Sequence, residues 1–319
     1  MSRNTCLARE GRRREKLVSD AQDEIKETYE YQKQLRRELR SDAGLVFHLD
    51  RIIRQRRNRR KEEKIILTKM RESCFDPRQR ITLYSYLLDY GLEWFDVFRI
   101  PNDANVLQMG RRGSGKTWCS DFVFYTKRKV LPFVYVVTST AGNGAWEKRV
   151  HPDFIFDGWD DDVIEQIRDR QKKVMKTPEW GVDPRVGILF DDMAADSNMR
   201  HNPKILEFAF YGRHYITLTM VTTQYYKQLK PGFRDNADII FLYKMDNEPE
   251  KKAIWEEHSG NVPWPVFETL VNRYSTDVSC LVIAKNGSTP LTRFYTFRAP
   301  DPGRYRLGCA SCWETPPVD

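Results

Sequence analysis

Eight consecutive residues have the types and spacing to bind phosphate: they read GRRGSGKT and fit G-x-x-x-x-G-K-[S/T] at every position. Gly110, Gly113 and Gly115 let the backbone wrap closely, so that successive N–H groups point at a phosphate group. The helix expected after the loop adds the positive end of its dipole. The predicted nucleotide-binding loop, called the phosphate loop below, comprises Gly110, Arg111, Arg112, Gly113, Ser114, Gly115, Lys116 and Thr117.

Two side chains at the end of this loop complete the expected chemistry. Lys116 is expected to reach the β- and γ-phosphates of a nucleotide, and the Thr117 hydroxyl to ligate Mg²⁺. An apolar strand is expected at 105–109 and a helix from about Lys116, which is the strand–loop–helix setting that the motif requires. The sequence therefore predicts a site for ATP or GTP with Mg²⁺, and we take ATP as the expected nucleotide.

Two adjacent carboxylates follow another apolar run. The stretch 186–190, VGILF, leads into Asp191 and Asp192, and acids at the carboxyl end of a buried strand lie on the edge where α/β sheets bind ligands. We expect Asp191 to hold Mg²⁺, usually through water, and Asp192 to polarise the attacking water. The alternative is that an aspartate after a strand caps a following helix.

A glutamine ends a third predicted strand. The run ITLTMVTT at 216–223 is followed by Gln224, which could contact the γ-phosphate or the attacking water. An ordinary loop position is the alternative, and the sequence does not decide between the two.

Short apolar runs alternate with helical segments from residue 104 onward. The alternation predicts an α/β fold with a doubly wound, mostly parallel sheet of buried strands. Strands are expected at 105–109, 133–140, 186–190, 216–223, 238–243, 280–284 and 293–297, and helices at 117–130, 163–175, 203–212, 249–258 and 266–274.

The positive charge is concentrated at the N-terminus. The chain carries +8, and residues 1–70 hold 20 Lys and Arg against 12 Asp and Glu, so this segment accounts for the whole excess. The remaining 33 basic and 33 acidic groups balance. The basic run at 54–64 could contact a phosphate backbone or serve as a localisation signal, or it could be a solvated helix face.

Four regions are expected: a basic helical extension at 1–72, a connector at 73–103, the phosphate-loop domain at 104–300 and an irregular tail at 301–319. No apolar stretch reaches the ~18 residues of a membrane span, and no secretory signal is visible, so we expect an intracellular protein with reduced cysteines. Cys309 and Cys312 have metal-ligand spacing, but no second pair accompanies them, so two ordinary tail cysteines are favoured.

Several blocks of the sequence resemble the packaging ATPases of nucleocytoplasmic large DNA viruses, within the wider FtsK–HerA group of DNA pumps. The resemblance covers about residues 104–300 and rests on GRRGSGKT, on ILFDDM, on the block from YGRHY through TTQ to RDNAD, and on the final CLVIA and RFYTFRA runs. The positions that match the most specific block are Gly212, Arg213, His214, Tyr215, Gln224, Arg234, Asn236, Ala237 and Asp238.

The resemblance implies a P-loop NTPase of the RecA/FtsK type that forms a homo-oligomeric ring, a hexamer or a pentamer. Such a ring hydrolyses ATP and drives double-stranded DNA into a capsid, which implies duplex DNA and a capsid or portal-type protein as partners. The place of action would be the host cytoplasm, in a virus factory, or the virion. Carried over by position, Gln224 matches the sensor glutamine of the family.

Four arginines compete for the role of an arginine finger at the γ-phosphate. By the resemblance, Arg213 and Arg234 are candidates to reach a neighbouring subunit, whereas Arg111 and Arg112 could act within their own subunit. Each of them could instead be an ordinary structural arginine. The Asp-Asp pair departs from the Asp-Glu pair of many related pumps, which puts the distance from Asp192 to the water in doubt.

Three other functions remain open. A helicase or a conjugation-type DNA translocase would share the fold, and a small-molecule kinase would share the loop. The basic extension and the long GRHY to RDNAD block argue against the kinase. A nucleotide-binding protein without turnover would bind and not hydrolyse.

Overall fold

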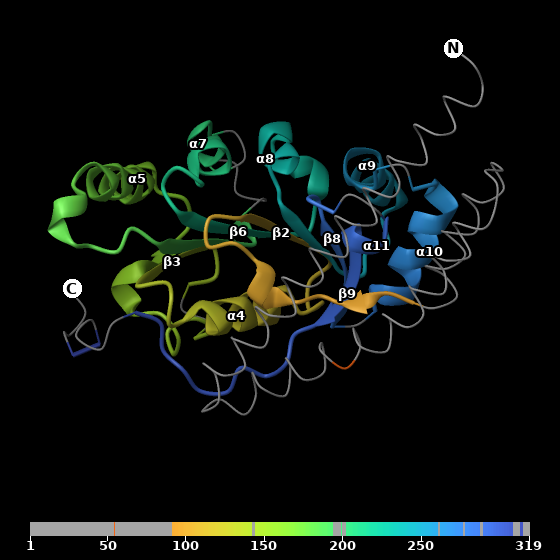
Figure 1. The fold of residues 1–319 in the computed structure, drawn as a ribbon, viewed down its shortest axis with the longest axis horizontal. Coiled ribbons are helices and arrows are strands. Elements are labelled where there is room, and N and C mark those ends of the chain that lie inside the picture. Colours follow the sequence, from red (N-terminus) through yellow and green to blue (C-terminus); the bar gives the residue numbers. More distant parts are fainter. Residues whose placement is uncertain are drawn as a thin grey trace, which may run out of the picture. The chain divides into compact units, whose positions relative to one another are not determined.

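The structure is a computed structural model that describes residues 54, 91–141, 144–193, 199, 202–260, 262–276, 278–287, 290–308 and 313–314. The helical extension predicted at 1–72, apart from Arg54, lies outside the described residues, as do Cys309 and Cys312. Figure 1 shows a sheet with helices on both faces.

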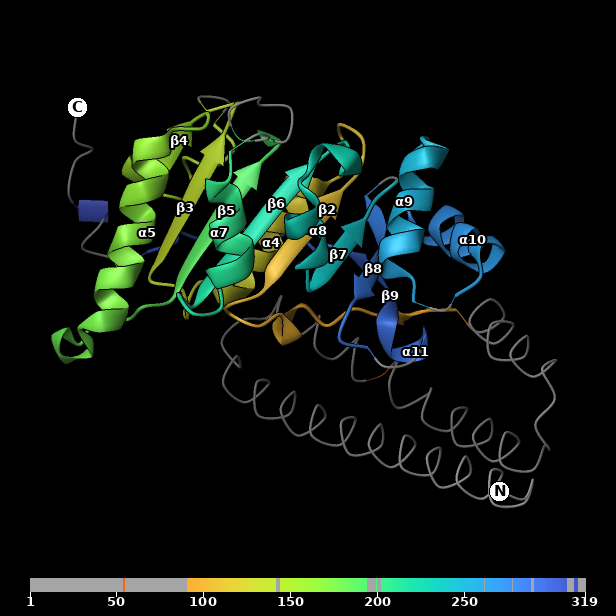
Figure 2. The ribbon, with the colours of Figure 1, turned by 90° about the horizontal axis from the view of Figure 1, so that it is seen from above.

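Nine strands form one sheet within the described residues, in the order β1-β9-β8-β7-β2-β6-β5-β3-β4. Neighbouring strands run parallel, except that β8 is antiparallel to both β7 and β9. Figure 2 shows β3, β5 and β6 side by side with their arrowheads at the same edge. The strands are β1 (Glu93–Trp94), β2 (Asn105–Met109), β3 (Phe133–Thr138), β4 (Ile155–Asp157), β5 (Val186–Asp191), β6 (Thr217–Thr223), β7 (Ile239–Leu242), β8 (Ser279–Ala284) and β9 (Phe294–Arg298).

Helices cover both faces of the sheet. One face carries α5, α7, α8 and α9, and α4 lies on the other (Figure 1). The helices are α4 (Lys116–Lys127), α5 (Asp161–Lys176), α7 (Lys204–Tyr211), α8 (Pro231–Asp235), α9 (Glu248–His258), α10 (Trp264–Tyr274) and α11 (Pro290–Arg293), with short 3-10 turns η1 (Val97–Arg99), η2 (Pro152–Phe154), η3 (Pro178–Trp180) and η5 (Tyr226–Gln228).

The central strands are buried along their whole length. Every residue of β2, β5, β6 and β7 is buried, which explains why these segments are mostly apolar residues and threonine and why no charged residue occurs before the end of a strand. Their side chains join those of the covering helices in one hydrophobic core, which includes Leu107, Phe190, Val221 and Leu242.

The observed fold confirms the predicted class, an α/β doubly wound and mostly parallel sheet. Each strand and helix predicted from residue 104 onward has a counterpart that differs from it by a few residues at its ends. Sequence reading missed β1, β4, α8 and α11, because two, three, five and four residues are too few to establish a periodicity. The stretch expected to be a connector contributes β1 to the sheet.

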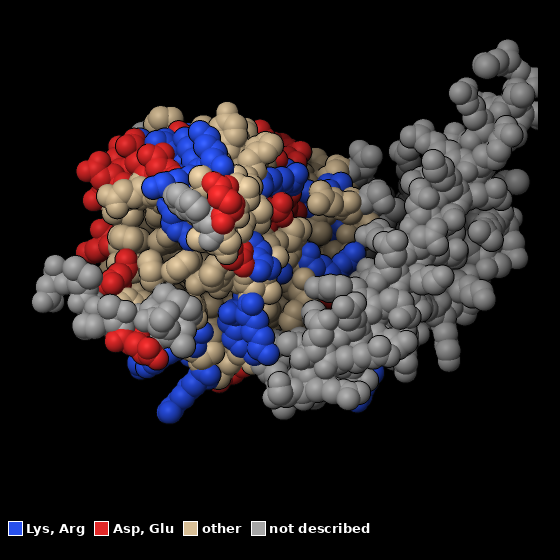
Figure 3. All heavy atoms as spheres, turned by 60° about the vertical axis from the view of Figure 1, so that its left-hand side comes forward, with Lys and Arg blue, Asp and Glu red and all other residues tan. Residues whose placement is uncertain are grey.

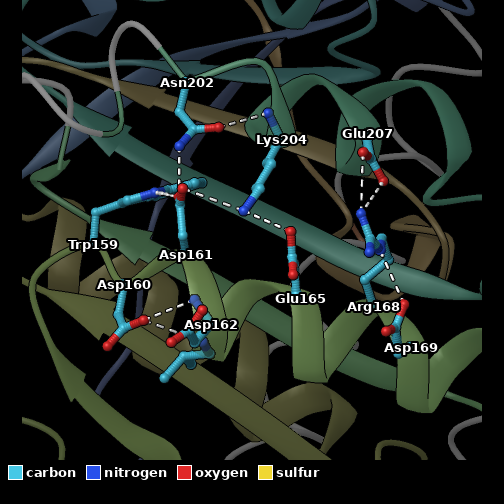
Figure 4. Close-up of polar contacts among 11 residues, drawn as sticks. Trp159, Asp160, Asp161, Asp162, Glu165, Arg168, Asp169, Asn202, Lys204 and Glu207 are labelled. Carbon is cyan, nitrogen blue, oxygen red and sulfur yellow. Dashed lines mark hydrogen bonds and ion pairs between the residues drawn. The ribbon is translucent and has the colours of Figure 1, made fainter.

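A network of polar side chains joins α5 to α7 (Figure 4). Lys204, the first residue of α7, lies 3.2 Å from Asp161 Oδ2 and 2.7 Å from Glu165 Oε1, both on α5. One turn further along, the Arg168 Nη1 atom donates to both Glu207 carboxylate oxygens at 3.3 Å. These contacts bridge the two helices beside β5.

The surface of the described residues carries mixed charge. Figure 3 shows both basic and acidic side chains on one face, and neither kind covers it. This agrees with the neutral balance of residues 71–319. Within the described part of the chain, none of the helices has the length and apolar character needed to cross a membrane.

Candidate nucleotide-binding site

Three neighbouring strands end at one edge of the sheet and bring the candidate residues together. β6 lies between β2 and β5, and all three run parallel. The phosphate loop follows β2, Asp191 is the last residue of β5, and Gln224 directly follows β6. This carboxyl edge is where α/β sheets bind ligands.

The loop has backbone geometry that only glycine tolerates well. A Cβ on Gly110 would lie 2.5 Å from the Cβ of Tyr243, so any side chain there would displace the loop or the segment that follows β7. Gly113 and Gly115 have φ of 76° and 96°, in the left-handed region. The Gly110 N–H donates to the Thr223 carbonyl at 3.2 Å, which fixes the start of the loop against β6.

Lys116 is buried within the loop, with 7% of its surface exposed. Its ammonium donates to the carbonyl of Gly110 at 2.7 Å and to that of Arg111 at 3.0 Å. Burial lowers the pKa of Lys116, and the negative charges of Asp192 and Asp191 oppose this effect. The side chain therefore places a desolvated positive charge inside the loop, close to two carboxylates, where a phosphate group would be attracted strongly.

Asp191 lies opposite Thr117 across the site. The Thr117 hydroxyl lies 3.5 Å from Asp191 Oδ2, so two oxygens of the kind that Mg²⁺ prefers lie side by side. The second oxygen of Asp191, Oδ1, accepts a hydrogen bond from the Thr222 hydroxyl at 2.7 Å. The carboxylate is buried, with 7% of the residue exposed.

Asp192 and Gln224 form a direct pair. The Gln224 amide donates to Asp192 Oδ2 at 2.9 Å. Asp192 has φ of 55°, an uncommon conformation for a residue with a side chain, which persists only where the surroundings hold it. Its own N–H donates to the Thr222 hydroxyl at 2.8 Å, so one threonine contacts both acids.

The residues present fit a nucleotide with Mg²⁺. Thr117 and Asp191 offer hard oxygen donors, and Mg²⁺ commonly takes only one or two protein ligands and completes its shell with phosphates and water. The Ser114 hydroxyl is buried in the loop and has no hydrogen-bond partner among the described residues, so it can serve a ligand. No group of three or more His, Cys, Asp or Glu side chains in the described part of the chain could hold a metal by itself.

The two loop arginines point into solvent. Both Arg111 and Arg112 are exposed, and the Arg111 guanidinium lies 3.9 Å from Asp246 Oδ2, a contact between two side chains that are 53% and 75% exposed. An ion pair this exposed to solvent does not fix the position of either side chain. Their positions in the loop put them next to the site of their own chain.

The other two arginines lie away from this edge. Arg213 pairs with Asp238, whose Oδ2 accepts the N–H of Asn105, the first residue of β2. Arg213 therefore lies at the amino edge, which is the edge of the sheet opposite the phosphate loop. The five residues of β2, roughly 16 Å, separate Arg213 from the loop of its own chain. Arg234 is 12% exposed and is held by Glu257 at 3.1 Å and by the Tyr226 ring at 4.7 Å.

Two residues that contact the candidate acids, Thr222 and Trp146, were not predicted from the sequence to be part of the site. Thr222 was recognised as part of a strand end, but its contacts to both acids depend on β6 pairing with β5. Trp146 lies 45 positions before Asp191, and its indole N–H donates to Asp191 Oδ2 at 3.1 Å. Only the folded chain reveals these contacts, because strand order and loop packing are not local properties.

Comparison with known proteins finds relatives in large DNA viruses. The chain is 25% identical over 190 residues to uncharacterized protein 088R of Invertebrate iridescent virus 3, covering 58% of this chain and 72% of that protein. It is 29% identical over 203 residues to uncharacterized protein L437 of Acanthamoeba polyphaga mimivirus, covering 61% and 71%. No family model matches the chain.

Solved structures with a similar fold include the genome packaging NTPase B204 of Sulfolobus turreted icosahedral virus 2 in complex with AMP. That comparison has a TM-score of 0.46 and 17% identity, and it covers 59% of this chain and 95% of B204. EssC from Geobacillus thermodenitrificans (ATPases 2 and 3) aligns with a TM-score of 0.42 and 15% identity, covering 60% and 39%.

Proposed function

We propose that this chain is an ATP-hydrolysing motor that moves double-stranded DNA into a viral capsid. The observation that carries the hydrolytic part is the convergence of the phosphate loop, two carboxylates and a glutamine on three neighbouring strand ends. A loop that only bound nucleotide would not need a glutamine-paired acid next to the magnesium ligands.

The chain's own groups divide the chemistry between them. Backbone N–H groups of the loop and Lys116 bind the phosphates, and Thr117 and Asp191 would hold Mg²⁺. When bound, Mg²⁺ supplies positive charge against the phosphate oxygens. Asp192 accepts a proton from the attacking water or polarises it, and Gln224, bonded to Asp192, fixes the carboxylate and contacts the water or the γ-phosphate.

The DNA part of the proposal rests on sequence. The GRHY to RDNAD block resembles that of the packaging ATPases, and the sequence relatives belong to large DNA viruses. The basic excess at residues 1–70 gives the chain a segment that could bind a phosphate backbone. A capsid or portal-type protein would then be the partner that receives the DNA.

A ring of copies would complete the site. Arg213 lies at the amino edge with 62% of its side chain exposed, so it can meet a neighbour's γ-phosphate but not its own. Arg234 is held within its chain by Glu257 and Tyr226, which makes it the weaker candidate for a finger. We therefore propose Arg213 as the finger of a homo-oligomeric ring, either a hexamer or a pentamer.

The experiment for this proposal combines molar mass with movement on DNA. Light scattering with ATP and duplex DNA should give the mass of five or six chains plus that of the bound DNA. With ATP, the protein should displace a triplex-forming strand from duplex DNA but should not separate a forked duplex. Strand separation without triplex displacement would identify a helicase, and phosphate transfer to a small acceptor would identify a kinase.

The basic segment should supply the salt-sensitive part of DNA binding. Deleting residues 1–70 removes 20 basic groups, so DNA binding should weaken and the logarithm of the affinity should fall less steeply with the logarithm of salt concentration. Fluorescence anisotropy of labelled duplex DNA at several salt concentrations measures this slope. An unchanged slope would exclude the segment from DNA contact.

A further inference from the structure

Trp146 contacts the candidate magnesium ligand directly and comes from a loop that the proposed mechanism does not use. It follows β3 in the chain, and only 3% of the residue is exposed. Its indole N–H donates to Asp191 Oδ2 at 3.1 Å, the same oxygen that lies 3.5 Å from the Thr117 hydroxyl. The other oxygen, Oδ1, accepts from Thr222 at 2.7 Å. Two neutral donors, Trp146 and Thr222, therefore each hold one oxygen of the Asp191 carboxylate.

The indole is itself fixed by its surroundings. Its ring packs edge-on against Phe124 of α4, with centroids 6.1 Å apart and an interplanar angle of 78°. The Trp146 carbonyl accepts the N–H groups of Arg149 and Val150, each at 2.8 Å. A tight turn thus holds the backbone on one side, and the helix that follows the phosphate loop packs against the ring on the other.

The turn that carries Trp146 is tied to α4 and to the segment after β9. The Arg149 guanidinium lies 3.2 Å from Asp121 Oδ1 of α4 and 4.6 Å from the centroid of the Tyr305 ring. The Arg149 carbonyl accepts the N–H of Leu307 at 2.7 Å. These contacts link a loop and a C-terminal segment to the position of the indole and, through it, to Asp191.

We propose that Trp146 is a positioning residue that keeps Asp191 Oδ2 directed at the metal position beside Thr117. Rotating the carboxylate about its Cβ–Cγ bond would break the hydrogen bonds to Trp146 and Thr222 together, so the pair selects one orientation. Donors behind a metal ligand typically change metal affinity by about 10- to 100-fold when they are removed. The inference rests on the proposed function, since it concerns the Mg²⁺ of the same site.

The test replaces the indole N–H and measures metal binding apart from turnover. Trp146→Phe keeps an aromatic ring against Phe124 and removes the donor. Electron paramagnetic resonance with Mn²⁺ and a nonhydrolysable ATP analogue should show Mn²⁺ affinity at least about tenfold weaker than in the native chain. Binding of the analogue without metal should stay within about twofold of native.

The matched control is Trp159→Phe. Trp159 stacks on Phe190, the neighbour of Asp191 on β5, with ring centroids 5.8 Å apart, and its N–H donates to Asp161 instead. This variant should bind Mn²⁺ as the native chain does. If both variants weaken Mn²⁺ binding equally, general loosening of β5 explains the loss and the positioning role is wrong. Native Mn²⁺ affinity in Trp146→Phe would overturn the role as well.

A second replacement separates the hydrogen bond from the shape of the ring. Benzothienylalanine at position 146 has the outline of tryptophan with sulfur in place of N–H, so it tests the donor even if Trp146→Phe does not fold. It should weaken Mn²⁺ binding in the same way, and native affinity would contradict the proposal. Failure of the proposed function looks different, because the native chain would then bind no Mn²⁺ with the analogue or would bind it without hydrolysing ATP.

Discussion

The two edges of the sheet carry similar polar residues in different arrangements. At the carboxyl edge, Lys116 donates to carbonyls of its own loop, and Gln224 and Asp192 contact each other across two strand ends. At the amino edge, Arg213 on the turn after α7 pairs with Asp238, whose carboxylate also bonds the first N–H of β2. In the first region the polar groups are those to which we assign the chemistry, and in the second they join elements of the fold.

The partners of a polar residue indicate whether it serves the chemistry or the stability of the fold. They do so better than the type of residue does. A charged group whose nearest partners lie in its own glycine-rich loop can exchange them for a phosphate. Arg234, by contrast, connects α8 to Glu257 of α9, and its loss would leave Glu257 without its cation. We therefore expect substitutions at the carboxyl edge to change activity and those at the amino edge to change stability, with Arg213 as the exception.

The largest effect should come from Lys116→Ala. It removes the charge at the β- and γ-phosphates, so ATP hydrolysis should fall at least about 10³-fold. The free energy of unfolding should hardly change, because the pKa of Lys116 is lowered by burial and the charged side chain contributes little to folding. Phosphate release and thermal melting measure the two quantities. Persistent ATPase activity in this variant would remove the loop from the mechanism.

Arg213→Ala should give the next largest effect, a loss of about 10³-fold in turnover, if the residue completes a neighbour's site. Because the missing arginine and an intact lysine can come from different chains, mixing Arg213→Ala with Lys116→Ala subunits should restore part of the activity. Turnover measured at several mixing ratios checks this. No recovery at any ratio, with both variants assembled as rings by light scattering, would assign the finger elsewhere.

The sequence predicted much of the carboxyl edge, because each of its parts is local. The phosphate loop has a fixed spacing, and Asp191, Asp192 and Gln224 stand directly after apolar runs that could be recognised as buried strands. The order of the strands was not predictable, since pairing of β5 with β6 joins segments about 30 residues apart. The contacts of Thr222 and Trp146 with Asp191 follow from that order and from a loop.

The amino edge could not be predicted in this way. Arg213 and Arg234 look alike in the sequence, and the resemblance to the packaging ATPases offers both as fingers. Their partners, Asp238 and Glu257, lie 25 and 23 positions away, and only packing decides that one side chain is 62% exposed and the other 12%. Strands as short as β1 likewise leave no periodic pattern.

Arg234→Ala should lower the free energy of unfolding by about 2 to 3 kcal/mol, because it leaves Glu257 in a partly buried position without its cation. Denaturant unfolding measures the change. Arg185→Ala is the matched control, since the Arg185–Asp183 pair is more exposed and should contribute less than about 1 kcal/mol. Equal losses in the two variants would contradict the structural role assigned to Arg234.

The smallest expected effect is a loss of stability in mild acid. Burial lowers the pKa of His258 to about 3, and the nearby positive charges of Lys285, Arg234 and Arg293 add to this. Below its usual pKa near 6.5 the unfolded chain binds a proton that the folded chain does not, so the free energy of unfolding should fall as pH falls from 6.5 towards 3. Between pH 7 and pH 5 this should remove about 1 to 2 kcal/mol.

Unfolding by denaturant at the two pH values measures the loss, and His258→Gln should reduce the difference between them. The glutamine does not titrate, so the variant keeps only the pH dependence of the other groups. The same pH dependence in the native chain and in the variant would show that another group is responsible.

We have proposed that the carboxyl edge hydrolyses ATP for work on DNA. The most direct measurement is phosphate release by the native chain from excess ATP and Mg²⁺, with no phosphoryl acceptor, in the presence and absence of double-stranded DNA. We expect many turnovers per chain and a rate that rises when duplex DNA is added. Nucleotide binding without phosphate release, or a rate indifferent to DNA, would contradict it.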